Sequence, residues 1–178
     1  MAVALASPYQ SENPKQSATI LKLNPEEAQD TYEVYSAVLG ERHDVHAWTI
    51  LTETNTFTFC LKPPAEFASV YRPVIEDFAK KDRTKFNLEA KFNLPDYTLG
   101  SPQGPPGIGT SKAQVTLSAV GFNRDRTRAY VCYSVKDQNG TGSSGSCLFL
   151  VRMNGKWLSD NDSHSPGCGF GFGGAVYR

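Results

Sequence analysis

The chain has 178 residues, with 18 Lys and Arg against 18 Asp and Glu, so its formal net charge at pH 7 is zero. This composition is typical of a globular domain and excludes collagen, a coiled coil and a disordered chain. The balanced charge also argues against nucleic acid as a partner, because phosphate binding needs a basic surface. No run of 18 apolar residues occurs, so we expect no transmembrane segment.

The first 23 residues are rich in Ser, Pro, Gln and Asn, and we expect a flexible tail before a single domain over residues 24–178. Within this tail, Ala4-Leu5-Ala6 before Ser7 has the small-x-small pattern of a signal-peptidase site. The pattern is either the remnant of a trimmed export signal or an ordinary alanine-rich start. The first interpretation predicts an exported protein, periplasmic or extracellular.

The first predicted element is a helix over residues 24–39. Asn24 is a good N-cap, Pro25 fits the first helical position, and Glu27 completes a pattern like a capping box. Apolar residues then recur on one helical face, and Gly40 predicts a left-handed end to the helix.

The middle of the chain predicts a hairpin and a second helix. Residues 46–52 and 56–61 are rich in β-branched and aromatic residues and are separated by a short turn. Apolar residues stepping by three and four predict a helix over residues 67–81, kinked or restarted at Pro73 because proline lacks the main-chain donor. Residues 85–93 alternate between apolar and polar, which is typical of a half-buried strand.

The second half of the chain has the pattern of an antiparallel meander. Asn154-Gly155 between two strand-like runs is a strong signal of a tight hairpin. From about Asp160 the chain is rich in Gly and Ser, and we expect an irregular tail. The predicted strands are 114–122, 128–136, 146–153 and 156–159, and the predicted turn and loops are 123–127, 100–110 and 137–145.

Two helices and about six strands with short connections predict an α+β fold with a curved antiparallel sheet, whose concave face packs on the helix 24–39. Cystatin-like and nuclear-transport-factor-2-like cones have this build, an analogy of fold that implies no function. The stretches 32–38, 118–123, 128–131 and 150–157 resemble short uncharacterised bacterial proteins. The resembling motifs are structural, a turn, a hairpin and an aromatic anchor, and the resemblance implies no activity.

The chain has four cysteines: Cys60, Cys132, Cys147 and Cys168. No pair has the spacing of a metal-ligand or redox motif, and an even count permits two disulfides in any of three connectivities. The alternative is that these cysteines are reduced and buried, which suits Cys132 and Cys147 because both lie in predicted strands.

The densest ionisable group is His43-Asp44-Val45-His46. Two imidazoles beside a carboxylate suit zinc or copper. A third ligand would have to come from the end of the chain: Asp160, Asp162 or His164. Because the segment follows a helix end, we interpret it as a solvated loop and predict no metal or other cofactor.

No catalytic constellation stands out. None of the cysteines lies at a helix N-terminus, and no nucleophile motif occurs. The glycine-rich stretch 167–174 is followed by too few residues for the helix that a phosphate loop requires. The acids considered for paired acid–base chemistry are Glu53, Glu66, Glu76, Asp77 and Glu89, and we predict no catalytic residue among them.

The sequence therefore favours a small, exported, non-catalytic module that binds a protein or a small ligand. The alternative is a cone-fold domain, enzymatic or ligand-binding, with a pocket between the helix 24–39 and the sheet. The candidate residues for that pocket are Tyr32, Tyr35, His46 and Trp48.

Overall fold

The computed structural model describes residues 23–43, 45, 47–57, 68–100, 113–136, 143–160 and 170–172. They form an α+β fold of two helices and a mixed sheet, and the α+β prediction is confirmed. The elements are α1 (Pro25–Gly40), β1 (Trp48–Leu51), α2 (Ala68–Lys81), β2 (Tyr97–Gly100), β3 (Ala113–Phe122), β4 (Arg128–Lys136), β5 (Ser143–Met153), β6 (Lys156–Ser159) and β7 (Phe170–Phe172).

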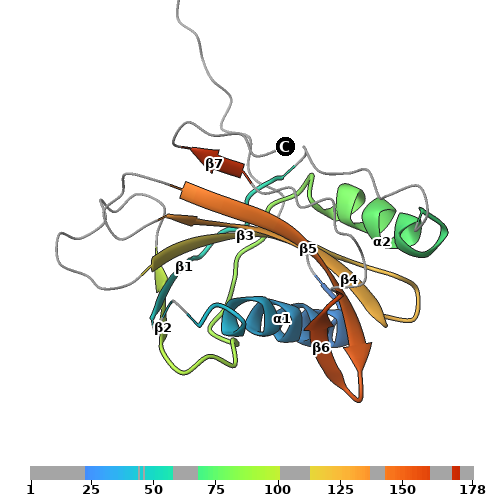
Figure 1. Cartoon of the computed structure of the whole chain (residues 1–178), viewed down its shortest axis with the longest axis horizontal. Helices are drawn as coiled ribbons and strands as arrows, with labels where there is room; N and C mark the ends of the chain where they lie inside the picture. Colours follow the sequence, from blue (N-terminus) through green and yellow to red (C-terminus); the bar gives the residue numbers. More distant parts are fainter. Residues whose placement is uncertain are drawn as a thin grey trace, which may run out of the picture.

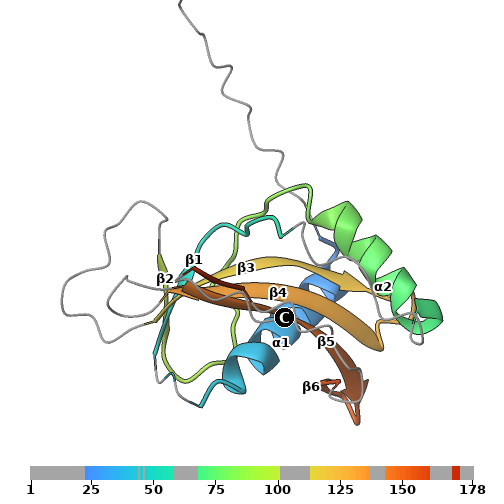
Figure 2. The same ribbon diagram turned by 45° about the horizontal axis from the view of Figure 1, so that its top comes forward.

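The sheet is open and mostly antiparallel, with the order β2-β1-β3-β4-β5-β6 and with β7 paired to the start of β5. The strands β3 to β6 form the predicted meander, whereas β1 runs parallel to both of its neighbours. Figures 1 and 2 show the curved sheet between the two helices, with α1 against its concave face and α2 on the opposite face.

Helix α1 begins as predicted but ends differently. The Asn24 side chain accepts a hydrogen bond of 2.9 Å from Glu27 N, which satisfies a main-chain donor of the first turn. Gly40 is the last helical residue, and the cap residue Glu41 has a φ of −71°. The predicted left-handed end is therefore wrong, because Glu41 stays right-handed and its N–H bonds back to the last turn.

The predicted hairpin of residues 46–52 with 56–61 is also wrong. Both edges of β1 are occupied by distant strands, β2 and β3, in parallel register. After β1 the chain turns away instead of reversing, and Asn55 N donates to Leu117 O at 2.8 Å. Residues 58–61 lie outside the described part of the chain.

Helix α2 is continuous through Pro73, so the predicted restart there does not occur. Pro73 is exposed to solvent, whereas its neighbour Val74 and, one turn later, Phe78 are buried in the hydrophobic cluster beneath the helix. The packing of this buried face keeps the helix together despite the missing main-chain donor.

The segment 85–93 is extended but is not a strand of the sheet. Phe86, Leu88 and Phe92 are buried as the alternation predicts, while Ala90 is exposed. Among the described residues its strand-like pairing is limited to one bridge, between Asn87 and Glu53. The alternation thus predicted the buried face correctly but not the pairing.

Hydrophobic clusters lie on both faces of the sheet. The larger cluster joins α1 to β1, β3, β4 and the segment 86–92. The smaller cluster lies under α2 and contains Phe57, Tyr71, Val74, Ile75, Phe78, Tyr130, Cys132, Cys147 and Phe149. Neither α1 nor α2, the helices of the described residues, is long and apolar enough to span a membrane.

Several predictions concern residues outside the described ranges. They are the flexible tail up to residue 22, the loop 101–110, most of the loop 137–145 and most of the C-terminal tail. Within that tail, β7 forms a short strand where we expected irregular structure, and β5 begins three residues earlier than predicted.

Candidate functional site

A groove of about 800 Å3 lies between the first half of α1 and the extended segment 86–93. Its size is within the range of sites that bind small molecules. The apolar lining consists of Leu23, Pro25, Ala28, Tyr32 and Phe86. The polar lining consists of Gln29, Glu33, Ser36, Asn87, Glu89, Lys91 and Asn93.

Tyr32 connects the two walls of the groove. Its hydroxyl oxygen accepts a hydrogen bond of 2.6 Å from Glu89 N. Burial raises the pKa of Tyr32, so the hydroxyl stays protonated at neutral pH. Its O–H proton has no acceptor among the described residues, and it is therefore available to a bound ligand.

Ser36, one turn after Tyr32 on α1, holds the other end of the same wall. Its hydroxyl donates to Tyr32 O at 2.7 Å and accepts from Asn93 N at 2.8 Å. The pair Tyr32 and Ser36 thus fixes the segment 86–93 against α1 at two points. The groove is shaped by these hydrogen bonds as well as by the buried phenylalanines of the segment.

The main chain at Asn87 faces the groove side of the segment. Thr54 N donates to Phe86 O at 3.1 Å and Leu88 N donates to Thr52 O at 2.8 Å, so Asn87 and Glu53 form a non-hydrogen-bonded pair. The Asn87 N–H and C=O therefore point away from Glu53, in the same direction as the Glu89 N–H that reaches Tyr32. Neither Asn87 group has a partner in the part of the chain that the structure describes.

The charged residues around the groove are paired with one another or with near neighbours. Glu33 lies 3.1 Å from an Arg152 guanidinium nitrogen and accepts from the Gln29 side chain at 3.0 Å. Glu89 and Lys91 form an ion pair of 2.5 Å, and this carboxylate raises the pKa of Lys91. With respect to the described residues, the groove therefore presents amides and a hydroxyl rather than an unpaired charge.

Of the predicted pocket residues, Tyr32 lines this groove. Tyr35 is fully buried between α1 and the sheet, where its hydroxyl donates to Ser118 O at 2.6 Å. Trp48 is 3% exposed and packs in the same cluster, and His46 lies outside the described residues. Trp48 also lines a smaller hollow of about 350 Å3 at the end of α1, beside His43 and Leu94. Sequence reasoning missed the wall formed by residues 86–93.

Two of the residues considered for metal binding, His43 and Asp160, lie in the described part of the chain. His43 is exposed after the end of α1, and Asp160 accepts a hydrogen bond from the Tyr71 hydroxyl. Asp44, His46, Asp162 and His164 lie outside the described residues. Within the described ranges no group of three His, Cys, Asp or Glu could hold a metal ion.

The candidate acids in the described part of the chain have different surroundings. Asp77 accepts from Phe122 N at 2.8 Å and pairs with Lys81, so it joins α2 to the end of β3. Glu53 lies 3.9 Å from Lys85, and Glu76 is exposed on α2. Glu66 is outside the described part of the chain.

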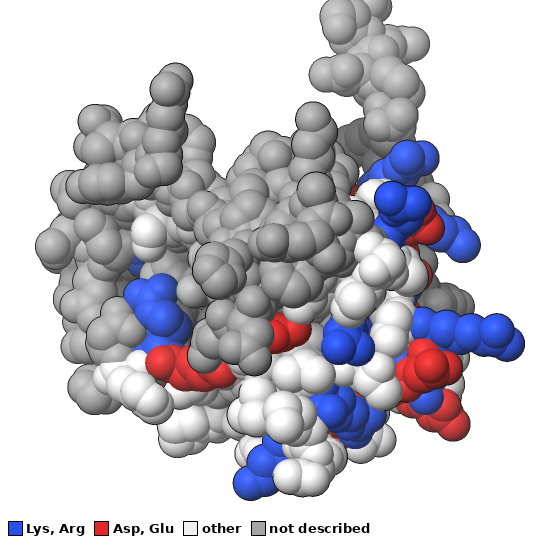
Figure 3. Space-filling model, turned by 45° about the vertical axis from the view of Figure 1, so that its right-hand side comes forward, with Lys and Arg blue, Asp and Glu red and all other residues white. Residues whose placement is uncertain are grey.

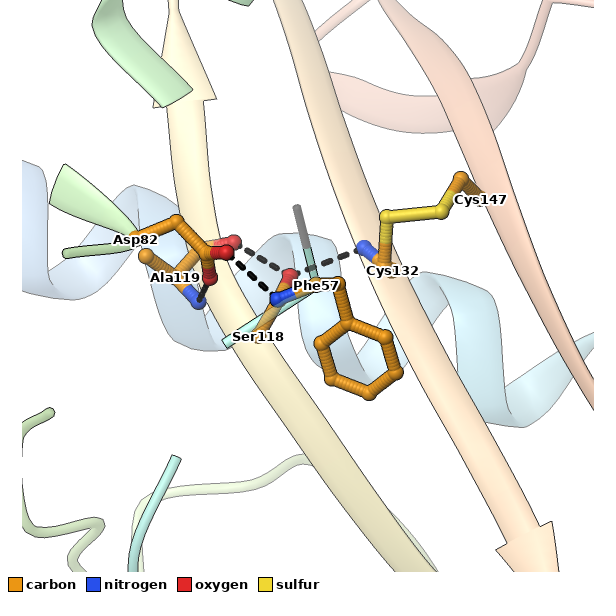
Figure 4. The surroundings of a disulfide bond; sticks show 6 residues. All are labelled: Phe57, Asp82, Ser118, Ala119, Cys132 and Cys147. Carbon is orange, nitrogen blue, oxygen red and sulfur yellow. Dashed lines mark hydrogen bonds between the residues drawn. A yellow bond between two sulfur atoms is a disulfide. The ribbon is translucent and has the colours of Figure 1, made fainter. Parts of the chain in front are cut away.

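A buried acid that the sequence analysis did not consider is Asp82, just after α2. It is 4% exposed and accepts from Phe57 N at 2.5 Å and from Ala119 N at 3.4 Å, as Figure 4 shows. Burial raises the pKa of Asp82 to about 6, and the two main-chain hydrogen bonds oppose that shift. Burial, and then the Asp82 charge, also raise the pKa of Tyr130.

The disulfide Cys132–Cys147 joins directly opposed residues of β4 and β5, with a Cα–Cα distance of 4.0 Å, and Figure 4 shows it together with Asp82. On the other side of β4, Ser118 and Ala119 form a bulge in β3 opposite Cys132. The alternative of two reduced thiols is thus wrong for this pair, while Cys60 and Cys168 lie outside the described residues.

One face of the molecule carries charges of both signs. On the face shown in Figure 3, basic and acidic side chains lie next to one another without a large patch of one sign. Asp30 of α1, nearly buried, contacts Arg126 at 2.7 Å and Arg152 at 2.9 Å. Arg126 also contacts the exposed Glu26 at 2.6 Å.

Comparisons with known proteins do not assign a function to this site. No protein-family model, no curated protein and no solved structure matches the chain.

Proposed function

We propose that the protein is a non-catalytic binding module and that the groove between α1 and the segment 86–93 is its ligand site. The observation that carries this proposal is the combination in one groove of an apolar lining with a Tyr32 hydroxyl proton and Asn87 main-chain groups that have no partner among the described residues. The acids of the groove are held in ion pairs, which favours binding over acid–base chemistry.

The proposal also concerns the cellular compartment in which the protein acts. The cross-strand disulfide supports a location outside the reducing cytosol, because stable disulfides persist in oxidising environments. An exported protein fits this chemistry.

The groove can be tested with indole, an uncharged aromatic probe, followed by the amide signals of the 15N-labelled protein in NMR spectra. We expect indole at millimolar concentration to shift the amide signals of Ala28, Tyr32 and Asn87. The variant Ala28→Trp, which fills the groove from α1, should abolish these shifts.

The matched control is Arg72→Trp, which places the same side chain on the exposed surface of α2, on the other face of the sheet. This variant should keep the wild-type response. The absence of any shift at the groove amides, or equal shifts in the Ala28→Trp protein, would contradict the proposed site.

A further inference from the structure

The proposed function does not specify the chemical class of the ligand. The main chain at Asn87 indicates this class. Residues 86–88 already pair with residues 52–54 along one edge, through the two hydrogen bonds at Phe86 O and Leu88 N. On the opposite edge, the Asn87 N–H and C=O lie beside the groove without a partner among the described residues. A free edge of this kind is where an extended peptide adds as a further strand.

We infer that the groove binds an uncharged extended peptide segment, which pairs with the Asn87 main chain and places one apolar side chain against Tyr32 and Phe86. This inference rests on the proposed function, since it names the ligand of the same groove. One peptide residue can satisfy both Asn87 groups, its C=O accepting from Asn87 N–H and its N–H donating to Asn87 C=O.

The charges around the groove favour an uncharged segment. Glu33 is matched by Arg152, and Glu89 by Lys91. A charged ligand side chain in the groove would lose hydration without meeting an unpaired opposite charge. An apolar side chain would instead bury its surface against Ala28, Tyr32 and Phe86.

The side chains at the rim match the same ligand. Asn87 and Asn93 each offer an amide donor and acceptor, and the Tyr32 hydroxyl offers a donor. Peptide carbonyl and N–H groups are partners for both kinds of group. The aromatic rings of Tyr32 and Phe86 supply contact area for one side chain of the segment.

The test measures dissociation constants for the blocked peptide acetyl-Ser-Gln-Phe-Gln-Ser-amide and for the same peptide N-methylated at its three central residues. N-methylation removes the main-chain donors and keeps the side chains. We expect the methylated peptide to bind about three- to tenfold more weakly, as the loss of one hydrogen bond implies. Replacing the phenylalanine by glutamate or lysine should abolish binding.

The matching protein variants are Asn87→Pro, which removes the main-chain N–H, and Asn87→Thr, which keeps it. The Asn87 N–H makes no hydrogen bond within the described structure, and proline is tolerated where an edge donor is free. We expect Asn87→Pro to weaken binding of the parent peptide by a similar factor relative to Asn87→Thr, because both variants lose the side-chain amide and only the proline variant also loses the main-chain N–H. If Asn87→Pro does not fold, the comparison of the parent and methylated peptides on the wild-type protein still tests the inference.

The outcomes separate this inference from the proposed function. Equal binding of the parent and methylated peptides, or no peptide binding while indole shifts the groove amides, would overturn the peptide inference alone. A lack of response to both peptide and indole would overturn both.

Discussion

The Cys132 N–H donates a 2.8 Å hydrogen bond to the Ser118 hydroxyl. Cys132 of β4 is therefore joined to β5 by the disulfide and to the β-bulge of β3 by this hydrogen bond. The Ser118 hydroxyl donates in turn to Ala119 O at 2.5 Å. Ala119 N reaches Asp82, whose other oxygen accepts from Phe57 N. The disulfide, the bulge and the buried carboxylate therefore form one connected unit under α2, as Figure 4 shows.

Stability should depend on pH through Asp82. The folded state raises the pKa of Asp82 from 3.8 to about 6, so the folded protein binds the proton more tightly than the unfolded chain does. The contribution of this group is therefore most favourable below the unfolded pKa and is lost as the pH rises through about 6.

The variant Asp82→Asn isolates this effect. Relative to the variant, the wild-type protein should gain roughly 2–3 kcal/mol of unfolding free energy between pH 7 and pH 4. Urea unfolding followed by circular dichroism at several pH values measures the difference. A gap between wild type and variant that stays constant over this range would show that Asp82 does not titrate as described.

The disulfide should contribute strongly to stability. Cys132 and Cys147 are 15 residues apart, and closing a loop of that length stabilises a fold by about 3 kcal/mol. We expect the double variant Cys132→Ala/Cys147→Ala to lose about that amount in urea unfolding. Peptide mapping of the non-reduced protein should yield the cross-linked peptides, and alkylation of both thiols without a reductant would contradict the pairing.

Asp30 should contribute more to the unfolding free energy than Glu26, which is exposed and contacts the same Arg126. Its nearly buried carboxylate bonds to Arg126 and Arg152, and these contacts join α1 to the β3–β4 turn and to β5. Asp30→Ala leaves both guanidinium groups without this partner and should lower the unfolding free energy by about 2 kcal/mol. The control Glu26→Ala removes an ion pair whose carboxylate is 77% exposed and should cost less than about 0.5 kcal/mol. Similar losses in the two variants would argue against this difference.

Sequence patterns predicted the parts of the fold that local chemistry determines. The Asn24 cap and the Asn154-Gly155 turn are set by neighbouring residues, and both occur, with Asn154 at a φ of 50° and Gly155 at 75°. The partners of β1 come from residues 97–100 and 113–115, far along the chain. A short apolar run such as 48–51 has no local signal that distinguishes a hairpin from a parallel pair, so the nearer partner was predicted wrongly.

The candidate site was predictable only in part, for the same reason. Tyr32 was identified from its place on α1, but its partner Glu89 is 57 residues away and contributes a main-chain N–H that side-chain patterns do not reveal. Asp82 follows two lysines in sequence and resembles a surface residue there. Its burial depends on Phe57 and Ala119, which only the folded chain brings to it.

The contact of α2 with the sheet should depend on Gly121. A Cβ atom at this position would lie 2.6 Å from Phe78 N, 2.5 Å from Phe78 Cβ and closer still to the carbonyl oxygen of Val74. Because main-chain atoms of a packed helix cannot move independently, Gly121→Ala should displace α2 and lower the unfolding free energy by at least about 2 kcal/mol.

The matched control is Gly40→Ala at the end of α1, where an added Cβ would meet no atom of the described residues within 4 Å. Because Gly40 is helical, alanine should leave the stability unchanged or raise it by up to about 0.5 kcal/mol. Thermal and urea unfolding of the two variants measure the contrast. A destabilised Gly40→Ala would indicate the left-handed helix end that the structure excludes, and an unaffected Gly121→Ala would show that α2 does not approach β3 as closely as described.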